Sequence, residues 1–118
     1  MLNSGNMSFE SIEMDSNDGE NDLLELQASL CQSLTHPFRL KLLYLLKDGE
    51  KNVNTIKELT NERQPFISQH LKVLRDKGVV NTRREHNEVY YSLTDPKILK
   101  ICKIVEEMIK EQHIIESE

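Results

Sequence analysis

The sequence predicts a mainly helical domain that carries one small β-hairpin, and three observations support this fold class. Apolar residues recur at helical spacing in several segments between residues 22 and 113. Proline and glycine separate these segments at positions typical of helix starts and stops. Residues 79–93 instead form two short runs rich in Val, Thr and Tyr, which are typical of strands.

Two helices are predicted at the start of the domain. The first spans residues 22–34, with Asp22 as its N-cap, because leucines recur there at helical spacing, namely Leu23, Leu26, Leu30 and Leu34. The residue before a proline avoids helical angles, so the helix ends before Pro37, which suits the first turn of the second helix. The second helix is apolar on most sides and ends at Asp48-Gly49, so we expect it to be the buried centre of the domain.

Two shorter helices joined by a turn follow. Residues 53–60 predict a helix that points Val53, Ile56 and Leu59 inward. A fourth helix is predicted over residues 64–77, with Pro65 in its first turn and Gly78 as a left-handed stop. Its core stripe falls at helical spacing and comprises Ile67, His70, Leu71 and Leu74. We interpret His70 as a buried, hydrogen-bonded histidine.

The hairpin and a last helix complete the domain. His86 and Asn87 form the turn of the hairpin, and Asn87 is suited to left-handed backbone angles. The last helix spans residues 96–113, with Asp95 as its cap and Pro96 at its first position. The order helix, helix, helix, helix, hairpin, helix predicts a winged helix-turn-helix.

The domain boundaries follow from composition. Residues 1–21 predict a disordered acidic tail, residues 22–113 the folded domain, and residues 114–118 a short C-terminal tail. The N-terminus has no basic region followed by an apolar stretch, as a secretory signal would. The chain also has no apolar run of about 18 residues, so we expect a cytoplasmic protein.

The charge is distributed unevenly along the chain. The formal net charge is −5, but residues 1–22 carry six acidic and no basic residues. Residues 51–84 carry eight Lys and Arg against three Asp and Glu. A basic segment of this kind indicates a surface that contacts phosphates. The alternative is a solvated charged face without a binding role.

The outward face of the predicted fourth helix supplies the candidate DNA-contacting residues. The second helix of a helix-turn-helix enters the major groove, where Gln can bond adenine and Ser can reach any base. The candidates on this helix are Gln64, Ser68 and Gln69 for bases, Pro65 on the same outward face, and Lys72 and Arg75 for phosphates. The candidates on the hairpin are Arg83, Arg84, His86 and Asn87.

Other function classes are less well supported. We find no nucleophile–base pair, no glycine-rich phosphate loop and no metal cluster, so we expect neither an enzyme nor a cofactor. The alternative is a winged-helix protein-interaction module without sequence-specific DNA binding. The basic segment and the polar outward face of the fourth helix argue against that alternative.

Four segments of this sequence resemble the arsenical-resistance repressor (ArsR/SmtB) family, and the resemblance covers about residues 27–109. Residues 34–40, LTHPFRL, resemble the family's L-S-H-P-x-R-L, and residues 64–75, QPFISQHLKVLR, resemble its recognition helix. Residues 77–80, KGVV, and 89–93, VYYSL, are similar to the segments around its hairpin. The resemblance implies a homodimer built through the first and last helices. It also implies a pseudo-palindromic DNA operator, base contacts from Gln64, Ser68 and Gln69, and release by an inducer.

The inducer sites of the family are not reproduced in this sequence. Where one family metal site has Cys-x-Cys in the third helix, this chain has Ile56-Lys57-Glu58-Leu59. The second family site lies on the last helix, where Asp95 remains but Lys97 and Met108 stand at histidine positions, with Glu111 at the last. Because zinc is held mainly by His and Cys, we predict no metal site.

A thiol switch is the inducer mechanism left open. Cys31 lies in the first predicted helix and Cys102 in the last, the two helices that the resemblance places at the dimer interface. Reversible oxidation there could change the spacing of the two recognition helices, provided that the Cα atoms come within about 7 Å. The alternative is that both cysteines are packing residues at the interface.

Overall fold

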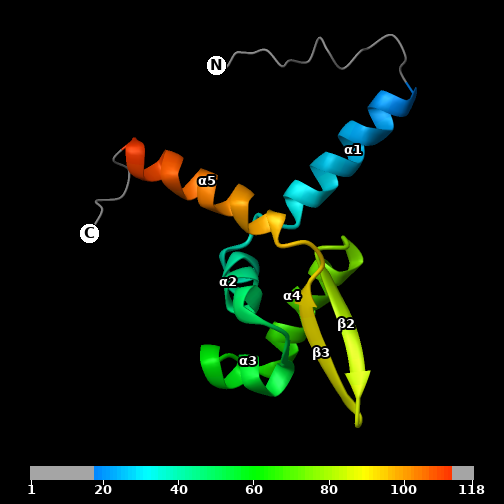
Figure 1. Ribbon diagram of the computed structural model, residues 1–118, viewed down its shortest axis with the longest axis vertical. Helices are drawn as coiled ribbons and strands as arrows, with labels where there is room; N and C mark the ends of the chain where they lie inside the picture. Colours follow the sequence, from blue (N-terminus) through cyan, green and yellow to red (C-terminus); the bar gives the residue numbers. More distant parts are fainter. Residues whose placement is uncertain (1–17, 113–118) are drawn as a thin grey trace. The chain divides into compact units, whose positions relative to one another are not determined.

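The computed structural model describes residues 18–112, and the chain divides after Gln32 into two units. In the first unit the described residues form helix α1 (Asp18–Gln32; Figure 1). Leu23 and Leu26 on this helix are exposed. The helix thus starts earlier and ends earlier than predicted. Asp22 lies inside α1, so its prediction as the N-cap is wrong, and Leu34 lies beyond the end of the helix. Residues 18–21, predicted as tail, are helical, while residues 1–17 and 113–118 lie outside the described part.

Helix α2 (Pro37–Leu45) begins the second unit and continues as a 3₁₀ turn, Leu46–Asp48. Its N-cap is His36, whose Nδ1 accepts a hydrogen bond of 3.0 Å from the backbone N–H of Phe38. Pro37 occupies the first position, as predicted. The core is centred on this helix, and its buried residues are Phe38, Leu42, Leu43 and Leu46.

Helices α3 (Val53–Thr60) and α4 (Gln64–Asp76) form the helix-turn-helix, as predicted. Asn61 turns the chain between them with a left-handed φ of 59°. The core stripe of α4 is confirmed, because all four of its residues are buried. The prediction for Leu59 is wrong: this side chain is 54% exposed, since so short a helix buries only the side that carries Ile56.

Strands β2 (Val80–Glu85) and β3 (Glu88–Leu93) form the predicted hairpin, which we call the wing (Figure 1). His86 and Asn87 both have positive φ, at 52° and 67°, which is the two-residue turn that suits the twist of a hairpin. A third strand, β1 (Lys51–Asn52), was not predicted. It pairs antiparallel with β3, giving the order β1-β3-β2 and joining the start of α3 to the wing.

Helix α5 (Lys97–Glu111) starts one residue later than predicted and ends at Glu111 rather than at residue 113. The N-cap residue is Pro96, so the prediction of Asp95 as the N-cap and Pro96 as the first helical residue is wrong by one position. The carboxylate of Asp95 still accepts a 2.9 Å hydrogen bond from the backbone N–H of Lys97, the first residue of the helix. Ile98 and Cys102 are buried, whereas a second apolar stripe is exposed, comprising Ile101, Ile104, Val105 and Met108. The architecture is a winged helix-turn-helix. In the described residues no helix has the length and apolar character that a membrane crossing requires.

Candidate nucleic-acid interface

A polar hollow of about 360 Å³ lies between the start of α4, the start of α3 and the wing. It brings together three predicted residues from two segments of the sequence, namely Gln64 and Ser68 of α4 and Asn87 of the wing turn. The other lining residues are Asn52, Val53, Asn54, Glu88, Val89 and Tyr91. Helix α4 and the wing therefore share one concave polar surface.

The amphipathic pattern of α4 determines which residues reach this surface. Because its core stripe faces inward, Gln64, Pro65 and Gln69 are exposed and Ser68 is half-buried. No side chain caps the first turn of α4, where Arg63 is the N-cap residue. Uncapped backbone N–H groups at a helix start, together with the helix dipole, favour an anion such as a phosphate.

The two predicted phosphate contacts on α4 lie farther along the helix. Lys72 and Arg75 are both exposed. Lys72 Nζ lies 2.9 Å from the Asp76 carboxylate, and this hydrogen bond lowers the pKa of Asp76. The charge of Lys72 is thus partly balanced within the helix, but an exposed pair of this kind is weak and its lysine can exchange partners.

The structure distinguishes the two wing arginines. The Arg83 guanidinium bonds both carboxylate oxygens of Glu50, at 3.1 and 2.5 Å, also pairs with Glu85, and lies 4.9 Å from the centre of the Tyr90 ring. These carboxylates raise the already high pKa of Arg83. Arg84 is exposed and forms no ion pair within residues 18–112. Since side chains alternate along a strand, Arg84 shares the face of β2 that carries buried Val80, and Arg83 lies on the opposite face.

The wing turn is fully accessible. The His86 side chain is 90% exposed, and its Nδ1 lies 3.7 Å from a Glu85 carboxylate oxygen. Asn87 is also exposed and lines the polar hollow. Both residues are placed where a wing can meet a DNA backbone or groove.

An aromatic cluster joins the start of α2 to α4. The His70 ring centroid lies 4.2 Å from that of His36 and 4.7 Å from that of Phe66. The ring of Phe38 contacts the rings of both Phe66 and His70. His70 is buried, as predicted. Its expected hydrogen bond is not found at Nδ1, which has no partner in the described part of the chain. Burial, and then the neighbouring His36 and Arg39, lower the pKa of His70.

The sequence did not single out four residues of the polar hollow: Asn52, Asn54, Glu88 and Tyr91. Asn52 had a recognisable signal, because Asn before a helical run is typical of an N-cap, and its Oδ1 does accept from the Thr55 N–H. Glu88 and Tyr91 lie on β3, which β1 joins to the start of α3, and Asn54 lies in the first turn of α3. A two-residue strand leaves no periodic pattern in the sequence.

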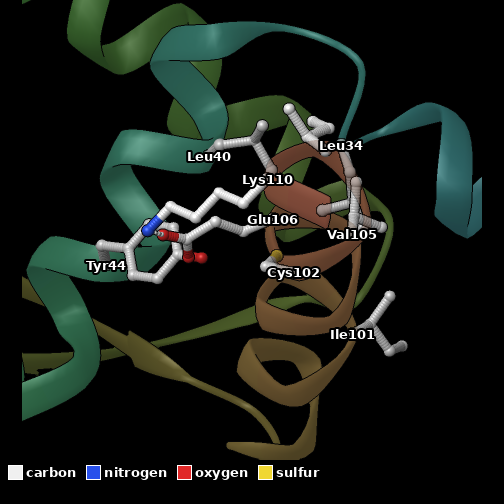
Figure 2. Close-up of a pocket in the computed structure, with 9 residues that line it drawn as sticks. Leu34, Leu40, Tyr44, Ile101, Cys102, Val105, Glu106 and Lys110 are labelled. Carbon is white, nitrogen blue, oxygen red and sulfur yellow. Dashed lines mark ion pairs between the residues drawn. The ribbon is translucent and has the colours of Figure 1, made fainter. Parts of the chain in front are cut away.

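A second, apolar hollow of about 560 Å³ lies between α2 and α5 (Figure 2). Its walls include Leu40 and Val105, and Tyr44 and the Glu106–Lys110 ion pair, at 3.2 Å, lie at one side. Cys102 also lines it, and burial raises the pKa of its thiol. Cys31 is exposed on α1. Within residues 18–112, no three His, Cys, Asp or Glu side chains are grouped so that they could hold a metal ion.

Comparison with known proteins gives consistent matches. Residues 36–82 match the family model described as bacterial regulatory protein, arsR family. The chain is 37% identical to the transcriptional repressor PagR of Bacillus anthracis over 83 residues, which are 70% of this chain and 83% of PagR. It is 40% identical to the biofilm growth-associated repressor of Agrobacterium fabrum over 76 residues, 64% of this chain, and spans only 65% of that repressor's length.

A solved structure supports the architecture. The homodimeric winged helix-turn-helix DNA-binding domain of a possible ArsR-family transcriptional regulator from Mycobacterium bovis superposes with a TM-score of 0.72. That match covers 90% of this chain and 99% of the other, at 25% sequence identity.

Proposed function

Because the chain belongs to the ArsR family of bacterial regulatory proteins, we propose that it is a sequence-specific DNA-binding transcriptional regulator of the cytoplasm that acts as a repressor. One observation carries this proposal. The polar hollow joins Gln64 and Ser68 of α4 to Asn87 of the wing in one concave surface. A helix that presents polar side chains at its exposed start, beside a wing, is suited to the major groove and its flanking phosphates.

The roles within the surface follow from side-chain chemistry. Gln64, Ser68 and Gln69 contact base edges, and the ring of Pro65 lies beside them at the start of the helix. Lys72, Arg75 and Arg84 contact phosphates, while His86 and Asn87 meet the DNA at the wing turn. Arg83 was predicted as a contact, but its carboxylate partners favour a role in holding the wing.

The regulator acts as a homodimer that binds a pseudo-palindromic operator. The exposed apolar stripe of α5 and the exposed leucines of α1 provide apolar surfaces of the kind that mark protein–protein contacts. The Mycobacterium bovis domain is homodimeric, which supports the same assembly here. Two copies related by a two-fold axis present two recognition helices to successive major grooves.

The test is a selection of bound sequences from random DNA, followed by binding measurements over a range of salt concentrations. We expect one motif with two related half-sites and an affinity that falls steeply with salt. Lys100→Ala, a surface change on α5, is the control and should select the same motif. A failure to enrich any sequence would overturn the proposal and favour a protein-interaction module.

Thiol oxidation at Cys31 and Cys102 remains the proposed inducer mechanism. Exposure of Cys31 favours its reaction, whereas the raised pKa of Cys102 lowers the fraction of reactive thiolate. The DNA affinity of a Cys31→Ser/Cys102→Ser variant, measured with oxidant and with reductant, tests the mechanism. A response like that of the wild type would eliminate it.

A further inference from the structure

The side chain of Asn52 makes two hydrogen bonds in different directions. Its Oδ1 accepts from the backbone N–H of Thr55 at 2.9 Å, which caps α3. Its Nδ2 donates to a carboxylate oxygen of Glu88 at 2.5 Å. Glu88 is the first residue of β3, so a single amide joins the start of the helix-turn-helix to the wing.

A second side-chain connection to the wing starts two residues before Asn52. Glu50, just before β1, bonds Arg83 of β2 through both carboxylate oxygens. Arg83 is directly opposite Tyr90 on β3, and Asn52 pairs with the same Tyr90 from the other side. The Glu50–Asn52 segment is therefore connected to both strands of the wing.

The backbone connection between these parts is short. β1 contributes only two residue pairs to the sheet. Base-contacting side chains lie on α4, whereas Arg84 and Asn87 lie on the wing, so the angle between the two determines which phosphates are reached while a given base is contacted. Two-residue pairing alone constrains that angle weakly, and the side-chain hydrogen bonds add a constraint to that pairing and to the packing of buried Val80 of β2.

We propose that the Asn52–Glu88 pair positions the wing relative to the recognition helix and thereby determines the spacing between base and phosphate contacts. This role rests on the proposed function. Glu88 lines the DNA-facing hollow but is bonded to Asn52, so it acts through the wing as a positioning residue. The hydrogen bonds from Arg83 of β2 to Glu50 support the same orientation of the wing.

Two single variants and one double variant distinguish a positioning role of the Asn52–Glu88 pair from effects on the helix cap and on charge. Asn52→Asp keeps the cap, since Asp and Asn cap helices about equally, but places two carboxylates together and breaks the pair. Glu88→Ala breaks the pair with the opposite change in charge. Asn52→Asp combined with Glu88→Gln restores one hydrogen bond with reversed polarity, from the new amide to the new carboxylate, at the net charge of the wild type.

The measurement is a phosphate-ethylation interference footprint, with affinities, on the DNA motif selected by the wild-type protein. We expect Asn52→Asp and Glu88→Ala each to lose the footprint of the wing and about tenfold in affinity, while the base contacts of α4 persist. The double variant should recover both. Without DNA, residual dipolar couplings should show the wing reoriented relative to α3 and α4 in the single variants and restored in the double variant.

Several outcomes overturn the proposal. One is an unchanged wing footprint in both single variants. Another is opposite effects of Asn52→Asp and Glu88→Ala, because charge alone would then explain them. A uniform weakening of all contacts, in parallel with a lower melting temperature, would indicate a merely structural role. If the wild-type protein selects no motif at all, the proposed function itself fails, and the role in DNA contact fails with it.

Discussion

At the scale of single residues, the structure separates two arginines that the sequence presents as equivalent. Arg83 and Arg84 are neighbours on β2, and strand alternation predicts that they point to opposite faces. Alternation does not predict which of them meets a carboxylate. The partner of Arg83 is Glu50, which lies 33 positions away in the sequence. The sequence therefore supplied both candidates, and the tertiary structure favours Arg84 for DNA.

We expect Arg84→Ala to weaken DNA binding severalfold and to reduce the slope of log affinity against log salt by about 0.9, the loss of one phosphate contact. Lys100→Ala, a surface change on α5, is the control, because it removes one positive charge outside the proposed DNA surface. Its salt slope should stay close to that of the wild type. Equal slope changes in the two variants would contradict the assignment.

His70 makes folding stability depend on pH. Its pKa is lowered in the folded protein by burial and then by His36 and Arg39, so an unfolded chain binds a proton there more readily than the folded one. Stability from this group is complete above the ordinary histidine pKa, near 6.5, and is lost as pH falls from there toward the lowered value.

We therefore expect the free energy of unfolding to fall between pH 7.5 and pH 5.5, and to fall less in His70→Phe, which keeps an aromatic ring beside Phe38 and Phe66. Urea unfolding at the two pH values measures the difference. His86→Phe serves as the control, because His86 lies exposed on the wing turn. An identical pH dependence in His70→Phe and the wild type would contradict the role of His70.

At the scale of elements, strong periodicity was predictive and short elements were not. The four core residues of α4 were identified from spacing alone, because a helix of this length repeats its buried side several times. The start of α1 was missed, since residues 18–21 are polar and contain a glycine that gives no helical signal. The exposed position of Leu59 was also missed, because eight residues offer too few repeats to tell its buried side from its flank.

Leu71 and Leu59 allow a direct comparison between a buried and an exposed leucine. Leu71 is fully buried on α4, and Leu71→Ala should lower the free energy of unfolding by about 2–5 kcal/mol. Leu59→Ala on α3 should change it by only about 0.5 kcal/mol or less. Chemical denaturation of both variants tests the prediction. A loss at Leu59 as large as that at Leu71 would mean that the side of α3 is wrongly assigned.

At the scale of the whole molecule, the net charge gives no indication of the basic segment. The net charge of −5 would disfavour DNA, yet residues 51–84 are basic and include α3, α4 and most of β2. The fold class followed from the order of the predicted elements, and the candidate DNA surface followed from that order together with this charge distribution. The hydrogen bonds between β1 and the wing could not follow from it, because they depend on how segments far apart in sequence come together.

The apolar stripe of α5 makes assembly testable. Ile104→Glu and Ile104→Lys should both shift the protein toward a monomer, because either charge is costly in an apolar interface. Met108→Leu keeps the apolar surface and should remain dimeric. Sedimentation velocity distinguishes the two states. Dimers that persist in both charged variants would place the interface elsewhere on the molecule.

Contact between α4 and the bases of a DNA site can be measured through Gln64. On the motif selected by the wild-type protein, a change at the base pair that Gln64 contacts should cost the wild type about 1–3 kcal/mol of binding free energy. In Gln64→Ala that penalty should vanish at this base pair and persist at all others. A uniform penalty at every position in both proteins would contradict the claim.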